Sequence, residues 1–394
     1  MPSAPLSRRH FLRGATLAGC SAAAWPLMSH VTLAAAPGDH RLVVIILRGA
    51  MDGLDALRPV GDPDFATLRA ASLTGDAPAL PLDGFFALHP DMGGLMPLWQ
   101  KGELAFAHAV ATPYRDRRSH FDGQDILEAG TGMDLAPDQV RGGWLNRMIQ
   151  SVPGMTSETA YAVGRSGLKV IAGDAPVTQW SPDTRVELDD QTQRLLERIY
   201  EDDPLFHAAG NEAFDLLARA DAGMMDDGDA AGAAALAEFA AARLNEEARI
   251  AAFSISGWDT HRNQKGVLGR RLRGLSAALL ALRDGLGDAW GQTTVLAMTE
   301  FGRTARENGT NGTDHGTGSA LIMAGGALRG GRVYGAWPGL AAADLYQERD
   351  LLPTADVRAY AAWAMRGLYG LERTLLEASV FPGLDMGTDP GILL

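Results

Sequence analysis

The sequence predicts an α/β protein with a doubly wound, mostly parallel sheet. Five short runs of apolar, often β-branched residues lack the alternation of a half-buried strand, so each is interpreted as a strand covered on both faces. Stretches with helical patterns separate most of these runs, as in βαβ units. About 358 residues follow position 36, and 46% of the whole sequence is hydrophobic, which is enough for one large core.

Each expected element follows from a local pattern. The expected strands are 42–47, 104–110, 250–255, 294–298 and 320–324. The expected helices are 190–200, 230–247 and 264–286. The stretch from about 150 to 248 is rich in Ala and Asp and has few strand signals. We therefore interpret it as a mostly helical insertion or cap within one α/β domain that spans 37–394.

The first 36 residues have the organisation of a twin-arginine export signal. Arg8 and Arg9 open a basic region, a mildly apolar stretch follows, and a run of small residues at 34–36 offers a cleavage site. Export by the Tat translocase would make the protein periplasmic or secreted. Cys20 ends a lipobox-like Leu-Ala-Gly-Cys segment, so a lipid anchor at Cys20 is the alternative, and the only route by which we expect contact with a membrane.

The charge of the chain argues against several classes of partner. The formal net charge is −13, and removal of the three arginines in the signal takes it to −16. Such a chain repels nucleic acid and anionic lipid, so we expect no nucleic-acid partner. Because Cys20 is the one cysteine in the sequence, the exported body has neither a disulfide framework nor a thiolate metal site.

Ionisable residues cluster after the predicted strands. Ligands of an open α/β sheet collect where the carboxyl ends of its strands meet. Each polar residue there could be a helix cap, a turn or a structural ion pair, but oxygen and imidazole groups gathered on one rim are what a divalent cation needs. The sequence therefore predicts a site for Zn, Mg, Ca or Mn, with candidate ligands Asp52, Asp259, His261, Glu300, Asp314 and His315.

Ser119 is the candidate nucleophile. It precedes a helical pattern at 121–129, where it could also be a plain N-cap. The amides and dipole at a helix start stabilise an anionic ester, and Arg118 and Arg303 are suited to bind phosphate or sulfate. Thr112, closer to the end of the preceding strand, is the alternative nucleophile.

Several motifs together resemble one exported bacterial family, domain of unknown function 1501. These are the export signal and the segments 47–55, 118–122, 257–261, 299–303 and 312–316. More distantly, the arrangement is similar to the alkaline phosphatase and sulfatase superfamily. This resemblance implies that superfamily's fold, with Ser119 as nucleophile and metal ligands at Asp52, Asp259, His261 and His315. Glu300-Phe301-Gly302 stands where the superfamily has Asp-His-Gly, so one histidine ligand is absent.

Two functions follow from these residues. The first is an exported metal-dependent hydrolase that acts on a small anionic ester of phosphate or sulfate. The alternative, favoured by the Glu300-Phe301 departure, is a non-catalytic periplasmic ligand-binding or assembly protein on a degenerate alkaline phosphatase-like fold. A structural export factor is a third interpretation. Turnover that depends on Ser119 would distinguish the first function from the other two.

Overall fold

The computed structural model describes residues 39–75, 77–135, 140, 142–152, 160–163, 168–175, 178–180, 229–246 and 248–394. The expected export signal, Cys20 and the expected helix at 190–200 lie outside the described residues. Much of the expected insertion at 150–248 also lies outside them, so the division of the chain into signal, domain and insertion stays a prediction.

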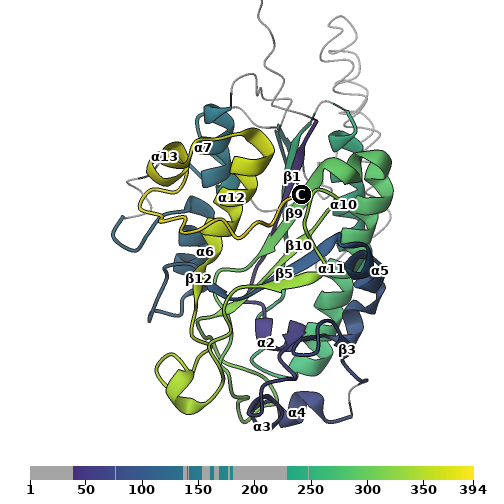
Figure 1. The fold of residues 1–394 in the computed structure, drawn as a ribbon, viewed down its shortest axis with the longest axis vertical. Helices are drawn as coiled ribbons and strands as arrows, with labels where there is room; N and C mark the ends of the chain where they lie inside the picture. Colours follow the sequence, from purple (N-terminus) through teal and green to yellow (C-terminus); the bar gives the residue numbers. More distant parts are fainter. Residues whose placement is uncertain are drawn as a thin grey trace, which may run out of the picture.

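In the described part of the chain, a nine-stranded sheet forms the centre of the fold (Figure 1). Its order is β11-β5-β10-β9-β1-β8-β6-β7, with β12 paired to β5. β10 runs antiparallel to β5 and β9, and the remaining described pairs are parallel, so the expectation of a mostly parallel sheet is confirmed. The strands are β1 (Arg41–Leu47), β5 (Leu104–Ala111), β6 (Ala160–Val163), β7 (Thr178–Trp180), β8 (Ile250–Ile255), β9 (Thr293–Met298), β10 (Ser319–Ala324), β11 (Arg332–Tyr334) and β12 (Ala355–Asp356).

The central strand β1 shows why this sequence builds a sheet that is covered on both faces. All of its residues are buried, and alternate side chains belong to two different apolar clusters. One cluster receives Leu42, Val44 and Ile46. The other receives Val43, Ile45 and Leu47. A continuous apolar run is therefore required here, because neither face of the strand meets water.

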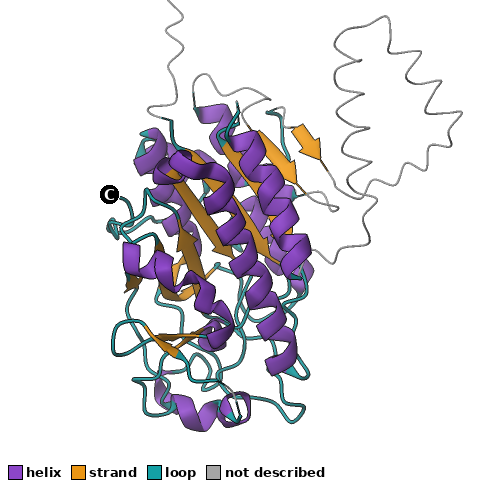
Figure 2. Ribbon diagram, turned by 90° about the vertical axis from the view of Figure 1, so that its right-hand side faces the viewer, coloured by secondary structure: helices purple, strands orange, loops and turns teal. Residues whose placement is uncertain are grey.

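Helices cover the two faces as separate layers (Figures 1 and 2). One layer contains α6 (His120–Ala129), α7 (Trp144–Ser151), α12 (Val357–Tyr369) and α13 (Arg373–Leu375). The other contains α5 (Met96–Lys101), α10 (Ala230–Leu244) and α11 (Gln264–Leu286). α11 has the expected bounds, and α10 ends before the expected residue 247. In the described residues, no helix has the length and apolar character needed to cross a membrane.

Short elements and long loops gather beyond the carboxyl ends of the strands, in the lower part of Figure 1. A three-stranded sheet has the order β2-β4-β3. The short strands and helices are β2 (Leu57–Arg58), β3 (Leu80–Pro81), β4 (Ala87–Leu88), α2 (Gly53–Ala56), α3 (Phe65–Leu68) and α4 (Ala70–Leu73). The described 3-10 and π turns are Pro90–Leu95, Lys169–Ile171, Gly287–Gln292, Ala342–Asp344 and Leu376–Val380.

The antiparallel direction of β10 places one long loop at the functional edge. β9 ends at Met298 and β10 begins at Ser319, so the loop at 299–318 starts and ends at the same edge of the sheet. The sequence analysis treated the 312–316 motif as part of a strand's carboxyl end, whereas it precedes an antiparallel strand. Both arrangements bring the motif to the same rim.

Candidate metal centre

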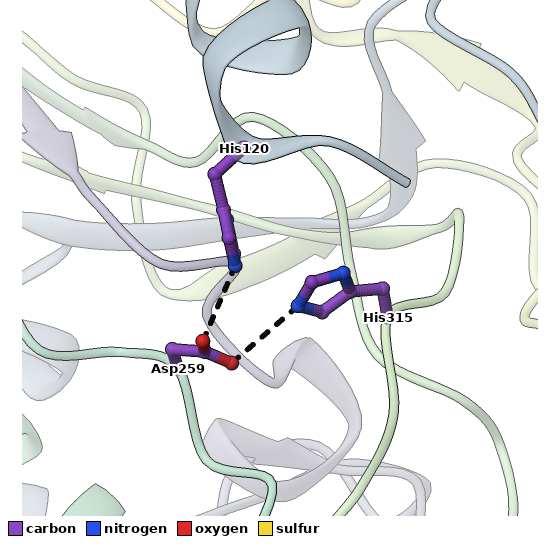
Figure 3. Close-up of side chains that lie close together, drawn as sticks. All are labelled: His120, Asp259 and His315. Atoms are coloured by element: carbon purple, nitrogen blue, oxygen red, sulfur yellow. Dashed lines mark ion pairs between the residues drawn. The ribbon is translucent and has the colours of Figure 1, made fainter. Parts of the chain in front are cut away.

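Three side chains from separate segments meet at this rim: His120, Asp259 and His315 (Figure 3). Each offers one ligand atom, and these atoms lie within 4.8 Å of one another. His120 Nε2 is 3.4 Å from Asp259 Oδ2, and His315 Nε2 is 3.5 Å from Asp259 Oδ1. His120 is the first residue of α6, Asp259 follows β8, and His315 precedes β10.

A third imidazole, that of His261, adjoins this group. Its Nε2 lies 3.2 Å from Asp259 Oδ1 and 2.9 Å from His315 Nε2. Its Nδ1 lies 3.2 Å from Asp314 Oδ1, so Asp314 contacts the ring nitrogen of His261 that does not face Asp259. We call His120, Asp259, His261 and His315 the histidine–aspartate centre.

The hydrogen bonds at Nδ1 orient all three histidines in the same way. Each Nδ1 faces a carboxylate or a carbonyl oxygen, which can accept a hydrogen bond but cannot donate one, so each Nδ1 carries a hydrogen. In a neutral ring, Nε2 then holds the lone pair and faces the shared aspartate. The acceptors are Glu300 Oε1 for His120 at 2.8 Å, Asp314 Oδ1 for His261 at 3.2 Å and the Arg118 carbonyl for His315 at 2.9 Å.

These lone pairs need a positive partner. His261 Nε2 and His315 Nε2 face each other at 2.9 Å, where two lone pairs repel unless a proton or a cation lies with them. His120 Nε2 is buried and forms no hydrogen bond of good geometry among the described residues; its contact with Asp259 Oδ2, at 3.4 Å, is electrostatic. Imidazole nitrogens and a carboxylate oxygen are the ligand types of zinc and related divalent cations. The residues present therefore fit a divalent cation.

Charges around Asp259 are closely balanced. Contact with Asp259, followed by the hydrogen bond to Glu300, raises the pKa of His120 to about 9. Burial raises the pKa of Asp259, but polar contacts with His120 and His315 and the hydrogen bond from Arg303 outweigh it and hold that pKa well below its usual range. A proton on His120 thus balances the carboxylates, and metal binding would release that proton.

Glu300 lies behind His120 and is fully buried. Its Oε1 accepts hydrogen bonds from the backbone amides of Gly49 and Ala50 at 3.0 and 3.1 Å, in addition to His120 Nδ1. A carboxylate that holds the far nitrogen of a ligating histidine fixes its ring and increases its basicity. The sequence analysis expected Glu300 to be a ligand, whereas in the structure its carboxylate accepts from His120 Nδ1 and from two backbone amides.

Arg303 is a second buried support. Its guanidinium donates to the carbonyls of Ala50 and Gly49 at 2.8 and 2.7 Å and to Asp259 Oδ1 at 2.5 Å. Its side chain is 0% exposed, so it positions Asp259 and has no surface with which to meet an ester. Arg118 is exposed instead, in a left-handed conformation (φ 53°) that accompanies its carbonyl bond with His315.

Asp52, expected as the first ligand, is not brought into the centre. Its carboxylate pairs with Arg69 through contacts of 2.6 and 3.1 Å and is buried with it. Oδ1 also caps α2 by accepting from Leu54 N and Asp55 N, and Oδ2 accepts from Gln264 Nε2 at 2.7 Å. These bonds occupy both oxygens, so as placed Asp52 stabilises the loop after β1.

Ser119 caps α6, as one of its two expected roles requires. Its Oγ accepts from Asp122 N at 3.4 Å, and its own amide donates to the Tyr114 hydroxyl at 2.7 Å. Thr112, the alternative nucleophile, is buried and donates to the Glu300 carbonyl at 3.1 Å. Ser119 is half-buried, so of the two hydroxyls it has the better access to a substrate.

The structure brings together Asp259, His261 and His315, which the sequence analysis grouped, and adds His120, which it did not include. One signal could have found it. His120 directly follows the candidate nucleophile Ser119, in the first turn of the expected helix. Because that helix starts at the rim, some side chains of its first turn must face the rim, and His120 was a candidate.

Comparison with known proteins identifies the family. A family model described as a protein of unknown function, DUF1501, matches residues 100–377. The chain belongs to this family. All four residues of the histidine–aspartate centre lie within the matched range of the DUF1501 model. No curated protein matches the chain.

Several solved structures resemble this DUF1501 chain at low sequence identity. The alkaline phosphatase of the Antarctic bacterium TAB5 has 10% identity and a TM-score of 0.34, with 73% of this chain and 91% of that one covered. The lipoteichoic acid synthase LtaP of Listeria monocytogenes has 9% identity and a TM-score of 0.40, covering 93% and 79%. The C-terminal periplasmic domain of EcEptC from Escherichia coli has 9% and 0.40, covering 91% and 93%. These TM-scores assign no activity or ligand to this chain.

Proposed function

We propose that this DUF1501 protein is an exported metal-dependent hydrolase of phosphate or sulfate esters. The observation that carries the proposal is the place of Ser119 in the chain. The residue before it, Arg118, accepts a hydrogen bond from His315, and the residue after it, His120, belongs to the histidine–aspartate centre. Ser119 is therefore flanked on both sides by residues that contact or belong to a group of side chains that fits a divalent cation.

The residues of the centre define the roles. His120, Asp259 and His315 would hold one divalent cation, with His261 beside them. When bound, the cation supplies a Lewis acid for the ester oxygen and favours ionisation of a nearby hydroxyl. Glu300 keeps the His120 ring oriented, and Arg303 keeps Asp259 in place.

Ser119 would carry out the transfer. Its Oγ forms a bond to phosphorus or sulfur as the bond to the ester's alcohol oxygen breaks; the serine proton goes to water, and the departing alkoxide takes a proton from water. A second water then cleaves the seryl ester and releases phosphate or sulfate. The exposed Arg118 guanidinium and the dipole at the start of α6 would favour the anionic group throughout.

Substitution of Ser119 tests this assignment. Ser119→Ala should abolish hydrolysis of p-nitrophenyl phosphate and p-nitrophenyl sulfate while leaving the bound metal content unchanged. Ser276→Ala is the matched control, because the Ser276 hydroxyl bonds a carbonyl within α11. Turnover retained in Ser119→Ala would refute the role of Ser119. A metal-loaded wild type that binds phosphate or sulfate but hydrolyses neither ester would favour the non-catalytic binding protein.

The export route belongs to the same proposal. Residues 1–36 would direct the folded protein through the Tat translocase. Cleavage at 34–36 would release the protein, whereas lipidation at Cys20 would anchor it. Replacement of Arg8 and Arg9 by lysine should retain the protein in the cytoplasmic fraction. A periplasmic location that persists in this variant would contradict the Tat assignment.

A further inference from the structure

A continuous set of polar contacts leads away from the histidine–aspartate centre into the interior. Gln124 lies one helical turn after His120 on α6, so both side chains share one face of the helix. Gln124 Nε2 lies 3.2 Å from Glu300 Oε1, the oxygen that also binds His120 Nδ1. Gln124 Oε1 lies 2.8 Å from Arg48 Nη1, and Arg48 Nη2 pairs with Glu128 Oε1 at 2.7 Å.

The chemistry of these groups leaves only one direction for the hydrogen bonds. A guanidinium only donates and a carboxylate only accepts. Arg48 must therefore donate to the amide oxygen of Gln124, and the amide nitrogen of Gln124 must donate to Glu300. This fixes the orientation of the Gln124 amide at both ends. Glu300 Oε1 therefore accepts from Gln124 Nε2 as well as from His120 Nδ1.

Glu128, at the other end of this set of contacts, is also held in place. The Glu128 side chain is 2% exposed, and its Oε2 accepts from the Val170 amide at 3.0 Å. Arg48 comes directly before Gly49 and Ala50, whose amides bind Glu300. Arg48 thus reaches the same carboxylate twice, through its side chain by way of Gln124 and through the backbone that follows it.

We propose that Gln124 and Arg48 are positioning residues of the metal centre, which act on His120 through Glu300 without touching the cation. The inference rests on the cation site of the proposed function. It explains why an arginine and a glutamine are held in a partly buried network that ends on Glu300. Loss of the direct outer partner of a ligating histidine lowers metal affinity about ten- to a hundredfold, and Gln124 lies one bond further out, so its loss should fall at the low end of that range.

Zinc affinity of the purified chain, measured by competition with a chelating dye, tests the proposal. Gln124→Met should raise the Kd for Zn²⁺ about tenfold. Gln150→Met is the matched control, because Gln150 lies on α7 and donates to Asn146, and its Kd should not change. Arg48→Met combined with Glu128→Met removes the ion pair without leaving a buried charge, and should weaken binding as Gln124→Met does.

A Glu300→Gln background separates positioning from general damage. If Gln124 acts through Glu300, Gln124→Met should cause no further loss of affinity once Glu300 is replaced. An equal loss in both backgrounds, or wild-type affinity in Gln124→Met, would overturn the inference and leave the proposed function intact. A folded wild type that binds no Zn²⁺ would overturn the cation site itself and this inference with it.

Discussion

Lowering the pH from 7 to 5 should destabilise the fold through His108, a residue of β5 that the proposed chemistry does not use. The side chain is buried, Nε2 lies 3.0 Å from the Leu57 carbonyl, and Nδ1 accepts from the Ala109 amide at 2.8 Å. Because a carbonyl only accepts, Nε2 carries the hydrogen and the ring is neutral. A second proton would have to sit on Nδ1, where it would face the Ala109 N–H.

The size of the effect follows from the pKa. Burial lowers the pKa of His108 from 6.5 to about 4, and the hydrogen bond to Leu57 and the charge of Asp52 only partly oppose this. In the unfolded chain the ring keeps its ordinary pKa, so between these values the unfolded state binds a proton that the folded state does not. Stability is therefore complete above about pH 6.5 and falls as the pH drops, by about 2 kcal/mol at pH 5 and about 3 kcal/mol in the limit below pH 4.

Urea unfolding of the wild type and of His108→Gln at pH 7 and pH 5 measures how much His108 contributes to the loss of unfolding free energy on acidification. A chelator in all samples removes any contribution from bound metal. The glutamine amide can still donate to the Leu57 carbonyl but cannot titrate, so the variant should be less stable at pH 7 and should lose about 2 kcal/mol less than the wild type on acidification. Equal pH dependence in the two proteins would refute the assignment of a neutral, buried His108.

Two further predictions concern the supports of the site. Arg69→Met should lower the free energy of unfolding by about 3–5 kcal/mol, because it leaves the buried Asp52 carboxylate unpaired; a loss below about 1 kcal/mol in urea unfolding would contradict that pairing. Gly302→Ala should destabilise by about 1–3 kcal/mol or more, since its Cβ would lie 1.8 Å from the Gly318 carbonyl oxygen. Gly309→Ala, where no atom lies within 4 Å of the added Cβ, is the control, and an equal melting temperature for the two variants would contradict the close contact.

The strands and the rim could be predicted because burial alone specifies them. A run such as β1, apolar on both faces, has no stable place except inside a covered sheet, and its following residues must then lie at the carboxyl edge. The helix at α11 was equally predictable from its periodicity and length. The antiparallel β10 was not, because its apolar run reads the same in either direction.

The roles within the site could not be predicted because they depend on tertiary partners. Nothing in the sequence shows that Arg69, from another loop, neutralises Asp52, or that Glu300 turns inward to accept from Gly49. An acidic residue at a strand end is a ligand or a support according to which donors reach it first. For the same reason His120 reads as a helix start until the partners of its two nitrogens are known.

Metal content tests the central claim most directly. The chain from residue 37, purified without chelator, should contain about one equivalent of a divalent metal by elemental analysis. One equivalent is expected because the imidazole and carboxylate groups of the histidine–aspartate centre form one site. His120→Ala and Asp259→Ala should each lose the metal while remaining folded by circular dichroism, and His108→Gln, outside the centre, should keep it. A folded wild type without metal, or full metal content in both ligand variants, would contradict the histidine–aspartate centre as a cation site.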